Sequence, residues 1–244
     1  MTGAAPTVRG VDPSDLSARL RPVAEPAALT GTGVAVVLVV AVAATATPAL
    51  WRHLRLAVTL VHELGHAVVG VAAGRRFTGF VLRGDASGHA VTVGPARGLG
   101  VVATTWAGYP MPALVGAGLV LAGAKGWAAP VLAASLVALL VALLFVRSAL
   151  TGLVVLTVGL SVGTLWWWRE DPVQQHVLVG VGVVLLVGAW RHLGSLVGDR
   201  SPRSDTGALA HLTGVPAVVW LVSFALACAV AAWAASGPLL APFA

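Results

Sequence analysis

The stretch Val-His-Glu-Leu-Gly-His at positions 61–66 lies inside an apolar run over residues 54–74. In a helix, His62 and His66 are one turn apart on the same face, so both imidazoles can bind one zinc ion. Glu63 stands beside them, where a carboxylate can act as the base for a metal-bound water. Ionisable groups inside a membrane span are costly and are functional candidates for that reason. The stretch predicts a metal site for peptide hydrolysis, the alternative being histidines that bond across helices beside a neutral or paired Glu63.

Composition places the surrounding chain in a membrane. Of the 244 residues, 58% are hydrophobic and 10% charged, and the mean hydropathy is +0.92, which leaves too few charges to cover a soluble surface. The net charge of +6 comes from basic residues scattered singly or in pairs between apolar runs, so no nucleic-acid partner is expected. Cys228 is the only cysteine, which excludes an internal disulfide and a cysteine-based metal site.

Apolar runs of about 20 residues predict an all-α polytopic membrane protein with about seven transmembrane helices. Residues 1–28 have the composition of a polar, disordered N-terminal tail, and residues 29–244 form the predicted membrane-embedded domain. The first run is expected to be a retained anchor rather than a cleaved signal. The predicted spans are residues 27–50, 54–74, 99–123, 128–146, 149–168, 173–193 and 215–236.

Two irregular segments interrupt this helical pattern. Residues 77–82 and 89–93 are rich in β-branched and aromatic side chains and flank a Gly/Asp/Ser turn, which predicts a membrane-associated β-hairpin over the metal site. This hairpin either binds substrate or simply connects two spans. Pro110 and Pro112 interrupt the third span, so the helix should kink or open beside the site, although irregular packing is an alternative explanation.

Positive charge gives an expected orientation. With seven spans, eleven of the 15 lysines and arginines fall on one side of the membrane. Cytoplasmic loops carry the excess of Lys and Arg, so the N-terminus and the hairpin region 75–97 are predicted to be cytoplasmic and Ala244 to lie on the other side. If residues 128–168 form one broken unit, the later loops change sides.

A catalytic zinc usually takes three protein ligands, so a third must come from elsewhere in the chain. Two candidates are Asp199 and Asp205. Asp205 is favoured because it begins an apolar-periodic run, where a helix start holds a carboxylate in a defined direction. Asp199 is the alternative, and His211 is a further candidate. The other downstream acids are excluded by their position in a flexible turn or on the opposite side of the membrane: Asp85, Glu170 and Asp171.

Taken together, these features resemble the site-2 protease family of intramembrane zinc metallopeptidases. The resemblance rests on the His-Glu-Leu-Gly-His motif, the hairpin that closely follows it, the broken third span and a distant aspartate. It is closest to a compact bacterial branch of the actinobacterial type without a PDZ domain. The resemblance implies that His62, His66 and a remote aspartate bind one Zn²⁺ and that Glu63 activates water. The family's aspartate usually stands in Asn-Pro-x-Asp-Gly or Leu-Asp-Gly, whereas Asp205 stands in Ser-Asp-Thr-Gly.

The expected function is that of a multi-pass cell-membrane zinc endopeptidase that cleaves the transmembrane segment of a membrane-protein substrate. Its expected partners are that substrate, the lipid bilayer and a regulatory membrane protein. The alternative is a non-proteolytic zinc-binding or transport-type membrane protein on the same scaffold. The two hypotheses differ in whether an aspartate lies beside the two histidines.

Overall fold

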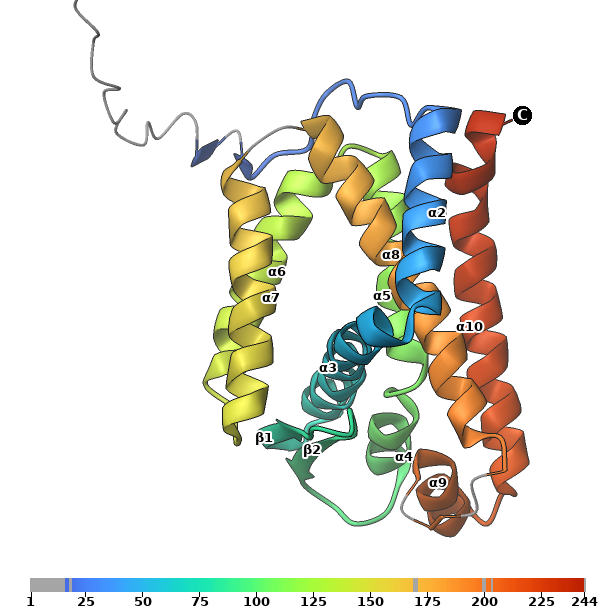
Figure 1. Cartoon of the computed structure of the whole chain (residues 1–244). Helices are drawn as coiled ribbons and strands as arrows, with labels where there is room; N and C mark the ends of the chain where they lie inside the picture. Colours follow the sequence, from blue (N-terminus) through green and yellow to red (C-terminus); the bar gives the residue numbers. More distant parts are fainter. Residues whose placement is uncertain (1–15, 18, 169–170, 199–200, 203, 244) are drawn as a thin grey trace, which may run out of the picture.

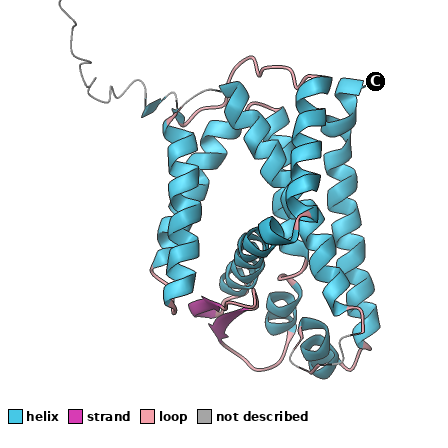
Figure 2. Cartoon of the chain, in the orientation of Figure 1, coloured by secondary structure: helices cyan, strands magenta, loops and turns pink. Residues whose placement is uncertain are grey.

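The computed structural model describes residues 16–17, 19–168, 171–198, 201–202 and 204–243. Of the predicted polar tail, residues 1–15 and 18 lie outside this description. The described chain is mostly helical and contains one two-stranded sheet (Figures 1 and 2). In chain order the elements are α2 (Gly31–Ala46), α3 (Pro48–Ala72), β1 (Arg76–Leu82), β2 (Gly88–Val93), α4 (Leu99–Trp106), α5 (Pro110–Ala124), α6 (Ala128–Leu143), α7 (Ala149–Trp167), α8 (Asp171–Leu196), α9 (Asp205–Thr213), α10 (Ala217–Leu240) and the short 3₁₀ helix η1 (Ala241–Phe243).

The number of full-length spans is smaller than the sequence predicts. Among the described residues, α3, α7, α8 and α10 are the 4 helices long and apolar enough to cross a membrane, and α4 with α5 makes up to 5 if the bent pair is one span. Helices occupy all the predicted positions, but α2 and α6 have only 16 residues each. Pro48 begins α3 directly after α2 ends, and α6 stops because the residues after it leave the helix to meet β1. The chain is a multi-pass membrane protein. In its described part, not all of the seven predicted spans have a helix long enough to cross a membrane.

The predicted hairpin is confirmed, and each strand begins one residue before its predicted start. β1 and β2 pair in antiparallel register from Arg76 opposite Val93 to Leu82 opposite Gly88, with an irregularity between Phe77 and Gly79. The other edge of β1 is also paired. Phe80 N–H donates to the carbonyl of Phe145 at 3.0 Å, and Arg147 N–H donates to the carbonyl of Phe80 at 3.1 Å. The loop between α6 and α7 therefore closes this edge of the sheet.

The break in the third predicted span is also confirmed. α4 and α5 meet at an angle of 63°. Pro110 and Pro112 lie in the first turn of α5, where the missing N–H groups need no helical partner, and residues 107–109 form the joint. A new helix can therefore begin at Pro110 in a different direction from α4.

Closely packed α5 and α8 form the centre of the molecule. A Cβ at Gly116 would lie 2.6 Å from the carbonyl oxygen of Gly182, and a Cβ at Gly182 would lie 2.6 Å from that of Gly116. These two glycines allow the helix backbones to touch, as small residues do in membrane bundles. Val120, Val179 and Phe224 are fully buried around this contact.

The arrangement of the chain ends differs from the charge-based expectation. Gly31 at the start of α2 lies against Pro242 and Phe243, so the chain enters and leaves the bundle at the same end. The hairpin lies at the other end, because α7 begins beside β1 and ends against Arg19 (Figure 1). Figure 1 shows α3 nearly along its axis while α2, α7 and α10 run across the view, so α3 does not return the chain to the end where α2 starts. Seven crossings would separate the two ends, whereas Gly31 and Pro242 lie together here.

Candidate metal centre

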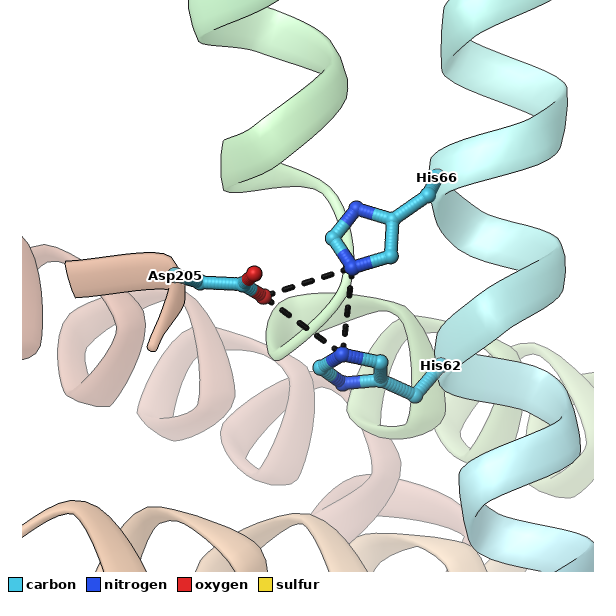
Figure 3. Close-up of side chains that lie close together, drawn as sticks. All are labelled: His62, His66 and Asp205. Atoms are coloured by element: carbon cyan, nitrogen blue, oxygen red, sulfur yellow. Dashed lines mark hydrogen bonds and ion pairs between the residues drawn. The ribbon is translucent and has the colours of Figure 1, made fainter. Parts of the chain in front are cut away.

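The two histidines of the motif lie one turn apart on α3, as their spacing predicts. Nε2 of His62 and Nε2 of His66 are 3.1 Å apart. Pro48 stands in the first turn of α3, and the helix ends before Gly74, which has a φ of +77°. The helix therefore spans the motif without interruption, and both imidazoles leave it on the same side (Figure 3).

Asp205 reaches the histidines from α9. The Ser204 hydroxyl caps this helix by accepting from the Gly207 N–H at 3.3 Å, and fully buried Leu209 anchors α9 in the core. The carboxylate of Asp205 points at both imidazoles, with Oδ2 3.4 Å from Nε2 of His62 and 3.3 Å from Nε2 of His66 (Figure 3). The three donor atoms lie within 4.8 Å of one another.

This donor set fits a zinc ion. Zinc bound tetrahedrally at its usual bond lengths separates neighbouring ligand atoms by about 3.3 to 3.5 Å. The three observed separations are 3.1, 3.3 and 3.4 Å. Oδ2 of Asp205 is buried and makes no hydrogen bond, although it faces two ring nitrogens. An acceptor atom held in this way is explained by a cation between the three side chains.

The backbone around His66 sets its tautomer. Nδ1 of His66 lies 2.7 Å from the carbonyl oxygen of Thr104 on α4. A carbonyl can only accept, so Nδ1 carries the proton and the lone pair of Nε2 faces His62 and Asp205. The ring of His62 instead packs edge-on against Tyr109, with 4.7 Å between the ring centroids. Thr104 could not be predicted from the sequence, because it acts through its backbone carbonyl, which every residue type has.

The joint between α4 and α5 lies directly against the cluster. A Cβ at Gly108 would overlap the imidazoles of His66 and His62. A Cβ at Gly65 would lie 2.7 Å from Cβ of Met111. Glycine at both positions lets the broken span approach α3 closely, which agrees with the prediction that it opens beside the site.

Glu63 is buried and 4% exposed, and it lies under the turn of the hairpin. A Cβ at Gly88, where β2 begins, would overlap the Glu63 carboxylate. The Thr59 hydroxyl donates to the carbonyl of Ala86 at 2.9 Å and ties the turn to α3. Turn and helix together border a cavity of about 200 Å³, which is lined by Arg55, Thr59, His62, Glu63, Ala86, Ser87, Gly88, Tyr109, His192, Ser195, Ser204 and Asp205.

The remaining ligand candidates are placed as follows. Asp199 lies outside the described residues, and His211 is exposed on α9 and is not part of the cluster. Asp85 is exposed in the hairpin turn, where its carboxylate accepts from the Ser87 N–H at 2.9 Å, and this hydrogen bond lowers the pKa of Asp85.

Three ionisable side chains that line the cavity carry little or no signal in the sequence. Arg55, His192 and Tyr109 were not among the site residues predicted from the sequence. Arg55 could have been found from its spacing, because residues 55, 59, 62 and 66 fall on one face of a helix. His192 and Tyr109 carry no such signal, since they come from α8 and from the joint before α5.

Two imidazoles, a carboxylate and a neighbouring glutamate, held between apolar helices, define the class of the protein as a membrane metallopeptidase. A family model described as Peptidase M50B-like matches residues 35–235, which include the whole cluster. The chain belongs to this Peptidase M50B-like family, which agrees with the resemblance to site-2 proteases. Neither a search of the curated proteins nor a search of the solved structures gave a match.

Proposed function

We propose that this chain is an intramembrane zinc endopeptidase that hydrolyses peptide bonds in the transmembrane segment of a membrane-protein substrate. In this proposal His62, His66 and Asp205 hold one Zn²⁺ and Glu63 is the catalytic base. The observation that carries it is the approach of the Asp205 carboxylate to both Nε2 atoms, next to Glu63 on an apolar helix.

The chemistry divides between the metal and the protein. Zinc, when bound, polarises a peptide carbonyl and lowers the pKa of a water. Glu63 accepts the proton from the attacking water on a carboxylate oxygen and delivers it to the leaving amine, which conserves the proton over the reaction. Burial of Glu63 beneath the hairpin turn keeps bulk water away from this transfer. His66 is held in one tautomer by the Thr104 carbonyl throughout.

The hairpin suits an extended substrate. A helix hides its carbonyls in hydrogen bonds, so the substrate must unwind before it can be cleaved. An extended peptide can add to a free strand edge. The outer edge of β1 is taken by residues 145–147, and among the described residues no strand pairs with the outer edge of β2. We propose this β2 edge, which begins at Gly88 beside Glu63, as the place where the unwound substrate lies.

The alternative function, a non-proteolytic zinc-binding or transport protein, lacks a favouring observation. An aspartate remote from the histidines would have favoured it. Asp205 instead lies 3.3 Å from His66. With Glu63 beside this cluster, the residues of a hydrolytic site are all near one another.

The test is the substitution Glu63→Gln in the purified full-length protein, with a membrane protein that carries one transmembrane segment as substrate. We expect cleavage to fall by about 10²- to 10⁴-fold, because the base is removed. Zinc content by elemental analysis should stay at that of the wild type, since Glu63 is not a ligand. Loss of zinc together with activity would make Glu63 a ligand and overturn the assignment.

A further inference from the structure

Arg55 is a charged side chain of the cavity that the proposed reaction does not use. It lies half-buried on α3 and lines the same cavity as His62 and Glu63. Its guanidinium has no hydrogen-bond or ion-pair partner among the described residues. A guanidinium carries five donors and stays charged in proteins, so an unpaired one in a cavity can still bind an anion.

Among the described residues, no carboxylate that lines the cavity pairs with Arg55. Glu63 and Asp205 are the acids among the described lining residues, and the Asp205 carboxylate lies against His62 and His66. A zinc ion together with these two carboxylates would have no net charge. Over the described lining residues, Arg55 is then a positive charge without a paired carboxylate.

The position of Arg55 sets where an anion would lie along a bound peptide. Arg55 precedes Glu63 by eight positions, and both face the cavity. At the rise of an α-helix this places it about 12 Å along the axis from Glu63. An extended peptide covers about 3.3 Å per residue, so the same distance corresponds to about three to four residues.

We infer that Arg55 forms a subsite for a carboxylate of the substrate, about three to four residues from the scissile bond. The inference rests on the proposed function, because it places the cleaved bond at Glu63. Ser87 and Ser195 line the same cavity, and the Ser195 hydroxyl donates to the carbonyl of His192 at 2.6 Å, which leaves Arg55 as the charged donor for an anion there. The carboxylate is either an Asp or Glu side chain or the free C-terminus of a substrate that has already been shortened.

A binding experiment tests the subsite without activity. Full-length Glu63→Gln protein in detergent micelles is titrated with fluorescent twelve-residue peptides of Ala, Leu and Gly that carry one Glu, or Gln at the same position. Because a charge-assisted hydrogen bond is strong, the Glu peptide should bind at least about tenfold more tightly than the Gln peptide. The double variant Glu63→Gln with Arg55→Gln should bind both peptides with the same affinity. With Arg55→Lys instead, part of the preference for the Glu peptide should remain.

Arg52 provides the matched control. It is exposed on the same helix, three positions earlier, and does not line the cavity. Arg52→Gln should therefore leave the preference for the Glu peptide unchanged. Equal affinities of Glu and Gln peptides for protein that contains Arg55, or a preference that persists after Arg55→Gln, would overturn the inference.

Cleavage mapping separates this inference from the proposed function. Wild-type protein should cut Glu peptides about three to four residues from the Glu, and mass spectrometry identifies the bond. Peptides without Glu that end in a free carboxylate or in an amide distinguish the two sources of the anion. If the position of the cleaved bond does not depend on the position of the carboxylate, Arg55 does not form a carboxylate subsite. A binding preference without any cleavage would instead contradict the proposed endopeptidase activity and leave the carboxylate subsite in place.

Discussion

Asp205 is the residue on which the candidate metal centre depends most, because it alone comes from outside α3. His62 and His66 share a helix and stay close in any fold that keeps that helix. Asp205 is brought to them by the capped start of α9 and by the burial of Leu209. The centre is therefore complete only when α9 is docked.

Substituting Asp205→Ala should remove zinc and activity together. Loss of an outer partner of a zinc ligand lowers metal affinity by roughly 10- to 100-fold, and loss of a ligand itself should exceed that. Zinc content by elemental analysis and cleavage of a transmembrane substrate are the measurements. Asp199→Ala is the control and should stay near wild type. Full zinc occupancy in Asp205→Ala would refute the assignment, and equal loss in both variants would mean that residues 199–205 act as one folded unit.

Gly88 controls the space around the proposed base. A Cβ at this position would overlap the Glu63 carboxylate, so Gly88→Ala should displace Glu63 and reduce cleavage while zinc content is kept. Gly84→Ala, in the same turn, is the matched control, because a Cβ at Gly84 would have nothing within 4 Å. Activity and zinc content of both purified variants are compared with the wild type. If the Gly88→Ala variant cleaves at the wild-type rate, the working position of the Glu63 carboxylate does not depend on its close contact with Gly88.

At the scale of helices, the contact between α5 and α8 supports the site. α5 begins at the joint that lies on the histidines, and α8 carries His192 and Ser195 of the cavity wall. The backbones of these helices meet at Gly116 and Gly182. Packing in the middle of the bundle therefore sets the distance between two walls of the cavity.

Gly116→Ala should weaken this packing. The added methyl group would meet the Gly182 carbonyl at 2.6 Å, and overpacking of this kind costs about 1–3 kcal/mol. Gly118→Ala places the same methyl group on the exposed face of α5, where nothing lies within 4 Å, and should be neutral or stabilising because alanine favours a helix. Thermal unfolding in detergent compares the two. Equal unfolding temperatures would show that α5 and α8 can separate without loss of stability.

The start of α2 and the C-terminal end of the described chain lie at one end of the molecule, and the hairpin lies at the other. Arg75, Arg76, Arg83, Arg97 and Arg147 belong to loops and strands at the hairpin end, while Arg19, Arg21 and Lys125 lie at the end where α2 begins. Five of these eight basic residues lie at the hairpin end, and the cytoplasmic position of the hairpin stays a prediction. With a cytoplasmic hairpin, we predict that the start of α2 and the end of α10 both lie on the opposite side of the membrane.

Reporter fusions test this orientation. A reporter inserted at Ser87 should be cytoplasmic, and reporters fused before Met1 and after Ala244 should both be non-cytoplasmic, since Gly31 lies against Pro242. Enzymatic activity of each reporter in whole cells gives the side. A cytoplasmic N-terminal reporter with a non-cytoplasmic C-terminal one would favour the seven-crossing path predicted from the sequence.

The sequence by itself determined the features that depend on neighbouring residues. Spacing of four positions places His62 and His66 on one helix face, and an apolar composition requires a membrane. Alternating β-branched residues around a Gly-rich turn specify the hairpin, and paired prolines specify the break before α5. Each of these follows from backbone geometry over a few residues, so no knowledge of the rest of the fold is needed.

Only the tertiary structure decided which distant groups meet. A helix start favoured Asp205 over Asp199, but its approach to the histidines depends on how α9 packs against α4 and α10. The crossing direction of α3, and with it the common side of the two chain ends, depends on contacts with α8 near Gly188. Arg55 and His192 share a cavity for the same reason. Contacts between separate helices are set by side-chain packing over the whole bundle, and a single sequence read along the chain does not specify that packing.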